Sequence, residues 1–299
     1  MKRKELLACA ALLLAAAIWG FAFVAQRVAI NFLPSFFYNG VRFLLGGISM
    51  LPLLLFYHPK QNIAKKMTRP ALLPGILAGL ILFAASSLQQ IGLEHTSSGE
   101  AGFITSLYII LVPLFGIFWG HRLRFVTLLS AVIAVLGMFL LSAKGGTILS
   151  PSNLFILLGA FFWAAQILII DHYMQKTNMM HLALIQYFVC AFLSLGISLL
   201  FERVNPYHIS GAMIPILYGG ILSVGIAYTL QILGQRYAQP AHSAVMMGME
   251  SVFSALGGFL ILGENLSMKG YIGCALMLMA ILTSQYSLFR RAKKPTNLR

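Results

Sequence analysis

The sequence predicts an all-α polytopic membrane protein with ten transmembrane helices in two inverted five-helix repeats. First, 59% of the 299 residues are hydrophobic and 9% are charged, which leaves too little polar surface for a soluble protein of this length. Second, polar and Gly/Pro-rich breaks divide the chain into ten long apolar runs. Third, segments of the two halves align with each other at a nearly constant offset.

The apolar runs define the spans, because a helix needs about 20 mostly apolar residues to cross the hydrocarbon core of a bilayer. The ten predicted spans are residues 5–27, 34–57, 70–92, 98–120, 124–143, 153–173, 179–201, 210–233, 240–262 and 269–289. Pro113 and Pro215 predict kinks in the fourth and eighth spans, since proline removes a helical hydrogen bond.

The first run resembles a signal peptide with a lipoprotein-type cysteine at Cys9. However, the apolar residues between Glu5 and Cys9 are fewer than the about 7 to 15 that a signal core requires. The run continues to about Ala25, which is long enough to span a bilayer. We therefore expect a retained first helix.

The lysines and arginines predict the orientation. With the N-terminus in the cytoplasm, sixteen of the 21 basic residues fall in cytoplasmic segments, four fall outside, and Arg42 lies within a span. This excess favours both termini in the cytoplasm and a multi-pass protein of the cell's cytoplasmic membrane. The same clusters account for the net charge of +14 without nucleic acid, because they alternate with apolar runs instead of forming one basic face.

An internal repeat relates the two halves. Residues 88–108 align with 230–250 at an offset of 142 without a gap, and an offset of 144 brings Trp19 over Trp163 and Arg42 over Gln186. Five spans per half is an odd number, so the second half must enter the membrane from the opposite side. The predicted repeats are residues 5–143 and 153–289, joined by a linker at 144–153. Inverted repeats are typical of secondary transporters, which bind substrate near the bilayer midplane.

Several motifs resemble the EamA branch of the drug/metabolite transporter superfamily. They are WGFAFV at Trp19, VRFLLGG around Arg42, EHTSSGEAGFITSLYIILVPLFG at 94–116 and MESVFSALGGFLILGENLS at 249–267. The motifs lie in both halves, so the resemblance covers nearly the whole chain. It implies ten helices in two repeats, and export or exchange of small organic solutes such as amino acids.

Two ionisable residues lie deep inside predicted spans, where a charge costs about 2.5 to 3.5 kcal/mol on insertion scales. Arg42 and Glu250 are eight and ten residues beyond Pro34 and Pro240, which places both near the midplane at about 1.5 Å per residue. In one hypothesis Arg42 attracts a carboxylate and Glu250 pairs with an amine or a coupling proton. In the other, the two charges neutralise each other and fix the packing of the repeats.

Uncharged residues of the spans complete the candidate substrate site. The set comprises polar side chains at repeat-related or neighbouring positions and two repeat-related tryptophans: Trp19, Gln89, Tyr108, Trp163, Gln186 and Gln231. The alternative for each glutamine is an interhelical hydrogen bond worth about 0.6 kcal/mol. The alternative for each tryptophan is packing.

The sequence lacks the motifs that mark other classes of protein. The sequence contains no H-E-x-x-H, G-x-S-x-G or phosphate-binding loop, so we expect neither an enzyme nor an ATP-driven pump. We also expect no cofactor and no metal, because the histidines and three cysteines are scattered. The predicted function is secondary transport of a small metabolite through a central cavity. The alternative is a lipid-carrier or drug flippase on the same fold; cargo, direction, coupling ion and oligomeric state stay open.

Overall fold

The computed structural model describes residues 3–56, 70–120, 125–142, 150–174, 176–265 and 268–292, and all regular structure in these ranges is helical. The α-helices are α1 (Arg3–Ala29), α2 (Ser35–Phe56), α4 (Leu72–Gly92), α5 (Ser98–Thr105), α6 (Tyr108–Gly116), α7 (Phe125–Ser142), α8 (Pro151–Tyr173), α9 (Met179–Phe201), α10 (Met213–Leu217), α11 (Tyr228–Gln235), α12 (Pro240–Met247), α13 (Glu250–Leu262) and α14 (Met268–Ala292). Short 3-10 turns are η1 (Ile117–Trp119) and η2 (Pro206–His208), and η3 (Tyr218–Ala227) is a π-helix.

The helices confirm an all-helical polytopic membrane protein. Seven segments of the described chain are long and apolar enough to cross a membrane, namely 4–29, 72–92, 98–116, 151–173, 179–201, 213–235 and 240–262. Helices α2, α7 and α14 occupy the other three predicted spans. The basic clusters predicted at 60–69 and 122–124, and the linker up to residue 149, lie outside the described residues.

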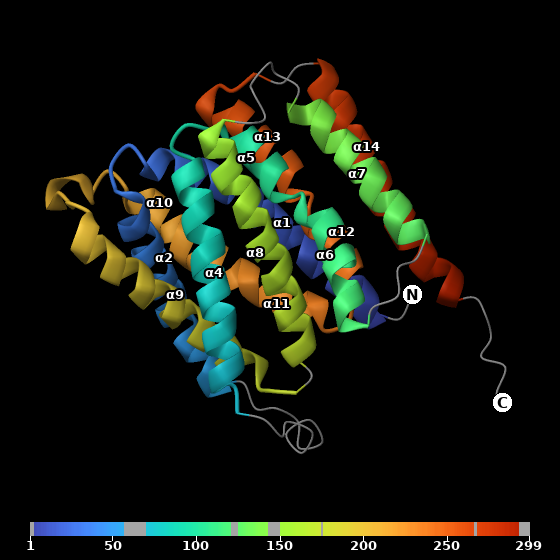
Figure 1. Cartoon of the computed structure of the whole chain (residues 1–299), viewed down its shortest axis with the longest axis horizontal. Helices are drawn as coiled ribbons and strands as arrows, with labels where there is room; N and C mark the ends of the chain where they lie inside the picture. The colour runs from blue at the N-terminus through green and yellow to red at the C-terminus, as the bar shows by residue number, and fades with distance from the viewer. Residues whose placement is uncertain are drawn as a thin grey trace.

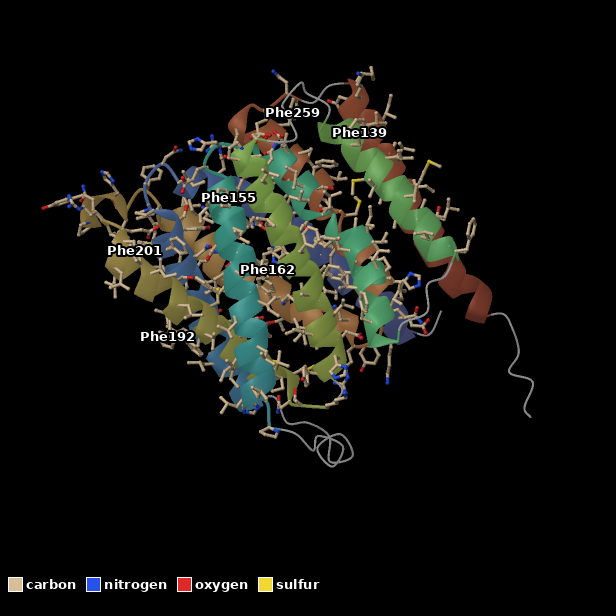
Figure 2. The ribbon with its side chains drawn as sticks, in the orientation of Figure 1. Phe139, Phe155, Phe162, Phe192, Phe201 and Phe259 are labelled. Atoms are coloured by element: carbon tan, nitrogen blue, oxygen red, sulfur yellow. The ribbon has the colours of Figure 1, made fainter. Side chains whose placement is uncertain are left out.

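Loops at opposite ends define two faces of the bundle. The upper face in Figure 1 carries the turns at 30–34, 93–97 and 202–212. Arg27 at the end of α1 donates to the Leu93 and Glu94 carbonyl oxygens at 3.2 and 2.9 Å. Thr96 donates to Asn153 at 3.0 Å, so α8 begins at the face where α1 and α4 end. Helix α8 therefore ends at the lower face, and so does α11, because its span follows the turn at 202–212 on the upper face.

Two predicted spans are broken at equivalent positions. The fourth span is divided into α5 and α6 at Ser106 and Leu107, and the ninth into α12 and α13 at Gly248 and Met249. These breaks are separated by the repeat offset of 142 residues. Pro113 lies within α6 and is not the site of the break. Each break leaves a half-helix that begins near the centre of the bundle.

The eighth span contains the π-helix η3. It follows Pro215 and is rich in small residues, which allow α2 to approach closely. A Cβ at Gly46 of α2 would come within 2.3 Å of Val224, so only glycine fits this crossing. Because a π-helix alters the local hydrogen-bond register, backbone carbonyls can accept bonds from neighbouring helices.

The outer surface is apolar, as a lipid-facing surface requires. Labelled phenylalanines on α7, α8, α9 and α13 are exposed at 37 to 80%: Phe139, Phe155, Phe162, Phe192, Phe201 and Phe259. Helices α7 and α14 lie side by side at one edge of the bundle (Figure 1). The polar groups that matter for function lie on the inner faces of the remaining helices.

Candidate functional site

A cavity lies at the centre of the bundle, between the two broken spans and α1, α2, α4, α8, η3 and α11. Its volume, counted as the space open to the centre of a water molecule, is about 40 Å³. The cavity is therefore narrow in this state. Its wall combines one basic and one acidic side chain with glutamines and large aromatic rings.

Arg42 enters the cavity wall from α2. It is 3% exposed, and its Nε donates to Asn39 Oδ1 at 2.9 Å. Asn39 in turn donates to the Ser86 carbonyl oxygen at 3.1 Å, which ties the arginine to α4. The guanidinium carbon lies 4.9 Å from the centre of the Phe43 ring and 5.5 Å from that of Tyr38. Cation–π contacts of this kind compensate part of the burial of the charge.

Glu250 is the first residue of α13, directly after the break in the ninth span. Its carboxylate is 4% exposed and accepts a hydrogen bond from Ser106 Oγ at 3.4 Å. The Tyr108 hydroxyl lies close by but does not reach hydrogen-bond geometry. Neither Glu250 nor Arg42 has an ion-pair partner among the described residues, although both line the same cavity.

Aromatic rings form the apolar part of the wall. Tyr228 lies between the two tryptophans, 4.8 Å from Trp19 in an edge-to-face arrangement and 6.2 Å from Trp163 in a stacked one. The Trp19 Nε1 donates to the Ser223 carbonyl oxygen of η3 at 3.2 Å. The Trp163 Nε1 donates to Gln89 Oε1 at 2.9 Å. Trp19 of α1 therefore bonds to η3, and Trp163 of α8 bonds to α4, which holds both rings in place.

Several polar atoms of the wall have no partner in the described parts of the chain. They are Thr105 Oγ1, Tyr108 Oη, Gln166 Nε2 and Gln231 Oε1, all buried. Buried polar atoms without a hydrogen bond are costly and are rare in folded proteins. Their position in one cavity makes them suitable for hydrogen bonds to a bound molecule.

The cavity brings together seven of the eight residues predicted from the sequence: Trp19, Arg42, Gln89, Tyr108, Trp163, Gln231 and Glu250. Gln186 does not line it. This side chain is fully buried, and α9 packs so closely on α4 that a Cβ at Gly79 would lie 3.1 Å from Gln186 Cα. The repeat alignment with Arg42 therefore does not place Gln186 beside the arginine in the cavity.

Gln26 and Gln166 line the cavity but were not in the predicted set. Gln26 accepts a hydrogen bond from Gln89 Nε2 at 3.1 Å, and Gln166 accepts one from Gln231 Nε2 at 3.1 Å. A sequence signal exists for both. They follow Trp19 and Trp163 by seven and three residues, which places each on the helix face of its tryptophan.

No group of three or more His, Cys, Asp or Glu side chains in the described ranges is arranged to hold a metal ion. The donors in the cavity wall are instead an arginine, amides, hydroxyls and one carboxylate. Such a set suits an organic molecule with polar and charged groups.

The chain is similar to known proteins over nearly its whole length. An uncharacterized transporter of Archaeoglobus fulgidus is 28% identical over 281 residues, covering 93% of this chain and 86% of the relative. The uncharacterized transporter YoaV of Bacillus subtilis is 22% identical over 286 residues, which cover 92% of this chain and 95% of the relative. A crystal structure of another protein shares the fold, with a TM-score of 0.77 at 22% identity over 96% of this chain and 99% of that one.

The names of both relatives agree with the expectation of a transporter and not an enzyme. The model of the EamA-like transporter family matches twice, at residues 6–143 and 150–285. The chain therefore belongs to the EamA-like transporter family, as a multi-pass membrane transporter.

Proposed function

We propose that the protein is a secondary transporter that exports or exchanges a small zwitterionic metabolite, such as an amino acid, by alternating access. The observation that carries this proposal is the pair Arg42 and Glu250, two buried opposite charges that line one cavity without an ion pair to each other. A zwitterion can satisfy both groups at once, with its carboxylate on Arg42 and its ammonium group on Glu250.

The energetics of burial support a ligand over a purely structural role. Ionisable residues within membrane spans are rare, and they usually belong to a substrate site or to a path for protons. A structural pair would be expected within hydrogen-bond distance, because the two charges then compensate each other's desolvation. Arg42 instead contacts Asn39 and two aromatic rings, and Glu250 contacts hydroxyl-bearing residues. The aromatic wall of Trp19, Trp163 and Tyr228 would contact the apolar part of the solute.

The proposed topology has ten spans in two inverted repeats, 5–143 and 153–289. Support comes from the double family match and from the equivalent breaks in the fourth and ninth spans. The distribution of basic residues supports two cytoplasmic termini in the cytoplasmic membrane. Two opposed repeats can rock against each other around a central site, which is how transporters of this construction expose the site to one side at a time.

Glu250 is also the proposed proton-coupling site. Among the described residues its carboxylate meets no cation, so either a proton or the amine of the solute must neutralise it in the buried state. Competition between the two for one carboxylate would couple solute movement to proton movement. The flippase alternative predicts a large basic pocket, whereas Arg42 is the one basic side chain among the described residues that line the cavity.

A thermal-shift screen of the purified protein against a metabolite library tests the proposal, because a ligand stabilises the folded state by mass action. Amphoteric solutes should raise the melting temperature of the parent protein. They should also raise that of Gln186→Leu, whose buried glutamine lies outside the cavity wall. The same solutes should fail to stabilise Arg42→Gln. Stabilisation by purely cationic or purely anionic compounds alone would contradict the proposed substrate class.

A further inference from the structure

Two glutamine pairs lie on opposite sides of the cavity. Gln26 and Gln89 lie near the ends of α1 and α4, which terminate at the upper face. Gln166 and Gln231 lie seven and four residues before the ends of α8 and α11, which terminate at the lower face. Each pair is joined by one amide–amide hydrogen bond of 3.1 Å, and all four side chains line the cavity.

The two pairs join the same spans of the two halves. Gln89 and Gln231, on the third spans, are 142 residues apart and match in the repeat alignment. Gln26 and Gln166, on the first spans, are 140 apart, about one helical turn from the offset of 144 that matches Trp19 with Trp163. In both pairs the residue of the third span of a half donates to the residue of the first span. An inverted repeat places equivalent contacts at opposite depths of the membrane.

We propose that these two hydrogen bonds are the gates of the central site, with Gln26–Gln89 closing the upper side and Gln166–Gln231 closing the lower side. This inference rests on the proposed transport function and assigns the residues that alternate. Both bonds are present here, so the structure corresponds to an occluded state. All four glutamines are at most 4% exposed, which agrees with little access to the site from either side.

The two gates differ in how completely they are satisfied. In the upper gate, Gln89 also accepts from Trp163 Nε1 at 2.9 Å, and Gln26 Nε2 donates to the Ala22 carbonyl oxygen at 3.1 Å. In the lower gate, Gln231 Oε1 and Gln166 Nε2 have no partner within the described chain. Trp19, the repeat equivalent of Trp163, donates instead to the carbonyl oxygen of Ser223 in η3.

This asymmetry predicts which side opens first. Opening the lower gate exposes to water two amide atoms that have no partner in the described chain, whereas the corresponding amide atoms of the upper gate already have hydrogen-bond partners in the protein. The occluded state should therefore open preferentially to the lower face. With cytoplasmic termini, the lower face is the cytoplasmic one.

Site-directed thiol labelling tests the gates in the full chain. The reporter is a cysteine introduced in the cavity wall by Ala22→Cys. The native cysteines Cys9, Cys190 and Cys274 are replaced, so that only the reporter reacts. Right-side-out and inside-out vesicles are treated with a membrane-impermeant maleimide, and the labelling rate is measured from each side. The parent should label faster from the lower face than from the upper face.

Breaking one gate should change access from its own side. Gln89→Leu should raise the labelling rate from the upper face roughly three- to tenfold, as expected for the loss of one hydrogen bond, and should leave the rate from the lower face unchanged or reduced. Gln231→Leu should raise the labelling rate from the lower face and not the rate from the upper face. Gln26→Leu and Gln166→Leu, which remove the same bonds from the other residue, should reproduce these patterns. Gln186→Leu, buried outside the cavity wall, should change neither rate.

Equal rates from both sides in every variant, or a change on the wrong side, would overturn the gate assignment. Labelling needs no substrate, so its failure is separate from a failure of the transport proposal. If Gln89→Leu does not fold, Gln26→Leu carries the upper-gate test, with folding monitored by size-exclusion chromatography. Normal solute transport with unchanged labelling patterns would refute the gates while leaving the proposed function in place.

Discussion

Ser106 Oγ donates to the carbonyl oxygen of Gly248 at 3.4 Å, and the two residues are separated by 142 positions, the offset of the repeat predicted from the sequence. Each residue marks the break in its own span, so the two broken helices touch at equivalent points. The same hydroxyl also reaches Glu250 at 3.4 Å. The contact between the halves is therefore directly linked to the acidic residue of the cavity.

The close crossing at Gly248 predicts a stability effect. A Cβ at this position would lie 2.1 and 2.9 Å from two side-chain carbons of Ile109, so the Ile109 side chain or the helices that cross here would have to shift. Gly248→Ala should destabilise the protein by about 1 to 3 kcal/mol, the usual cost of overpacking. Thermal unfolding in detergent measures it. Gly196→Ala in α9 is the matched control, because a Cβ there meets no atom within 4 Å. Equal stability of the two variants would contradict the close crossing.

The hydrogen bonds at the start of α2 predict a second effect on stability. Glu202 accepts from the Phe36 and Phe37 amides at 2.9 and 2.8 Å, so it satisfies first-turn donors of α2 from the end of α9. Glu202→Ala should lower stability by about 0.5 to 2 kcal/mol, the range for a lost N-terminal cap. The neighbouring Arg203→Ala should have little effect, because Arg203 makes no hydrogen bond within the described residues. A similar loss in both variants would argue against capping.

The coupling role predicts a pH-gradient phenotype for Glu250. Glu250→Gln keeps the shape of the side chain but cannot bind or release a proton. Transport driven by a pH gradient in proteoliposomes should be lost, while the variant folds as the parent does. Glu100→Gln is the control, since Glu100 accepts from Asn153 at 2.7 Å outside the cavity wall. Uptake by the parent that is identical with and without a pH gradient would refute coupling.

The sequence predicts the helical spans well because the bilayer imposes a length of about 20 apolar residues on each. It does not predict the breaks at Ser106 and Gly248. Neither position carries a proline, and the proline in the fourth span, Pro113, is accommodated within α6. The breaks depend on the crossing of two helices far apart in sequence, which no local pattern encodes.

The site was partly predictable for a related reason. Arg42 and Glu250 stand out because charges are rare in apolar spans. Gln26 and Gln166 do not stand out in the repeat alignment, because their offset of 140 differs from the 142 and 144 of the other matched segments; their spacing from Trp19 and Trp163 is the signal that marks them. Conversely, the offset of 144 selects Gln186, which packs between α9 and α4 instead of lining the cavity. Alignment gives the equivalent helix, but packing decides which face meets the site.

The central claim is that one solute bridges Arg42 and Glu250. The most direct measurement is calorimetric binding of an amphoteric solute identified in the thermal-shift screen, compared with analogues that lack its carboxylate or its amine. The three ligands are titrated into the parent, Arg42→Gln and Glu250→Gln, with folded protein quantified in parallel.

The parent should bind the complete solute most tightly, and each variant should lose about tenfold or more in affinity, as expected for a charged hydrogen bond. Arg42→Gln should not further weaken the analogue without a carboxylate, and Glu250→Gln should not further weaken the analogue without an amine. Equal losses for all three ligands in both variants would contradict the account, because the two charges would then hold the fold and not the solute.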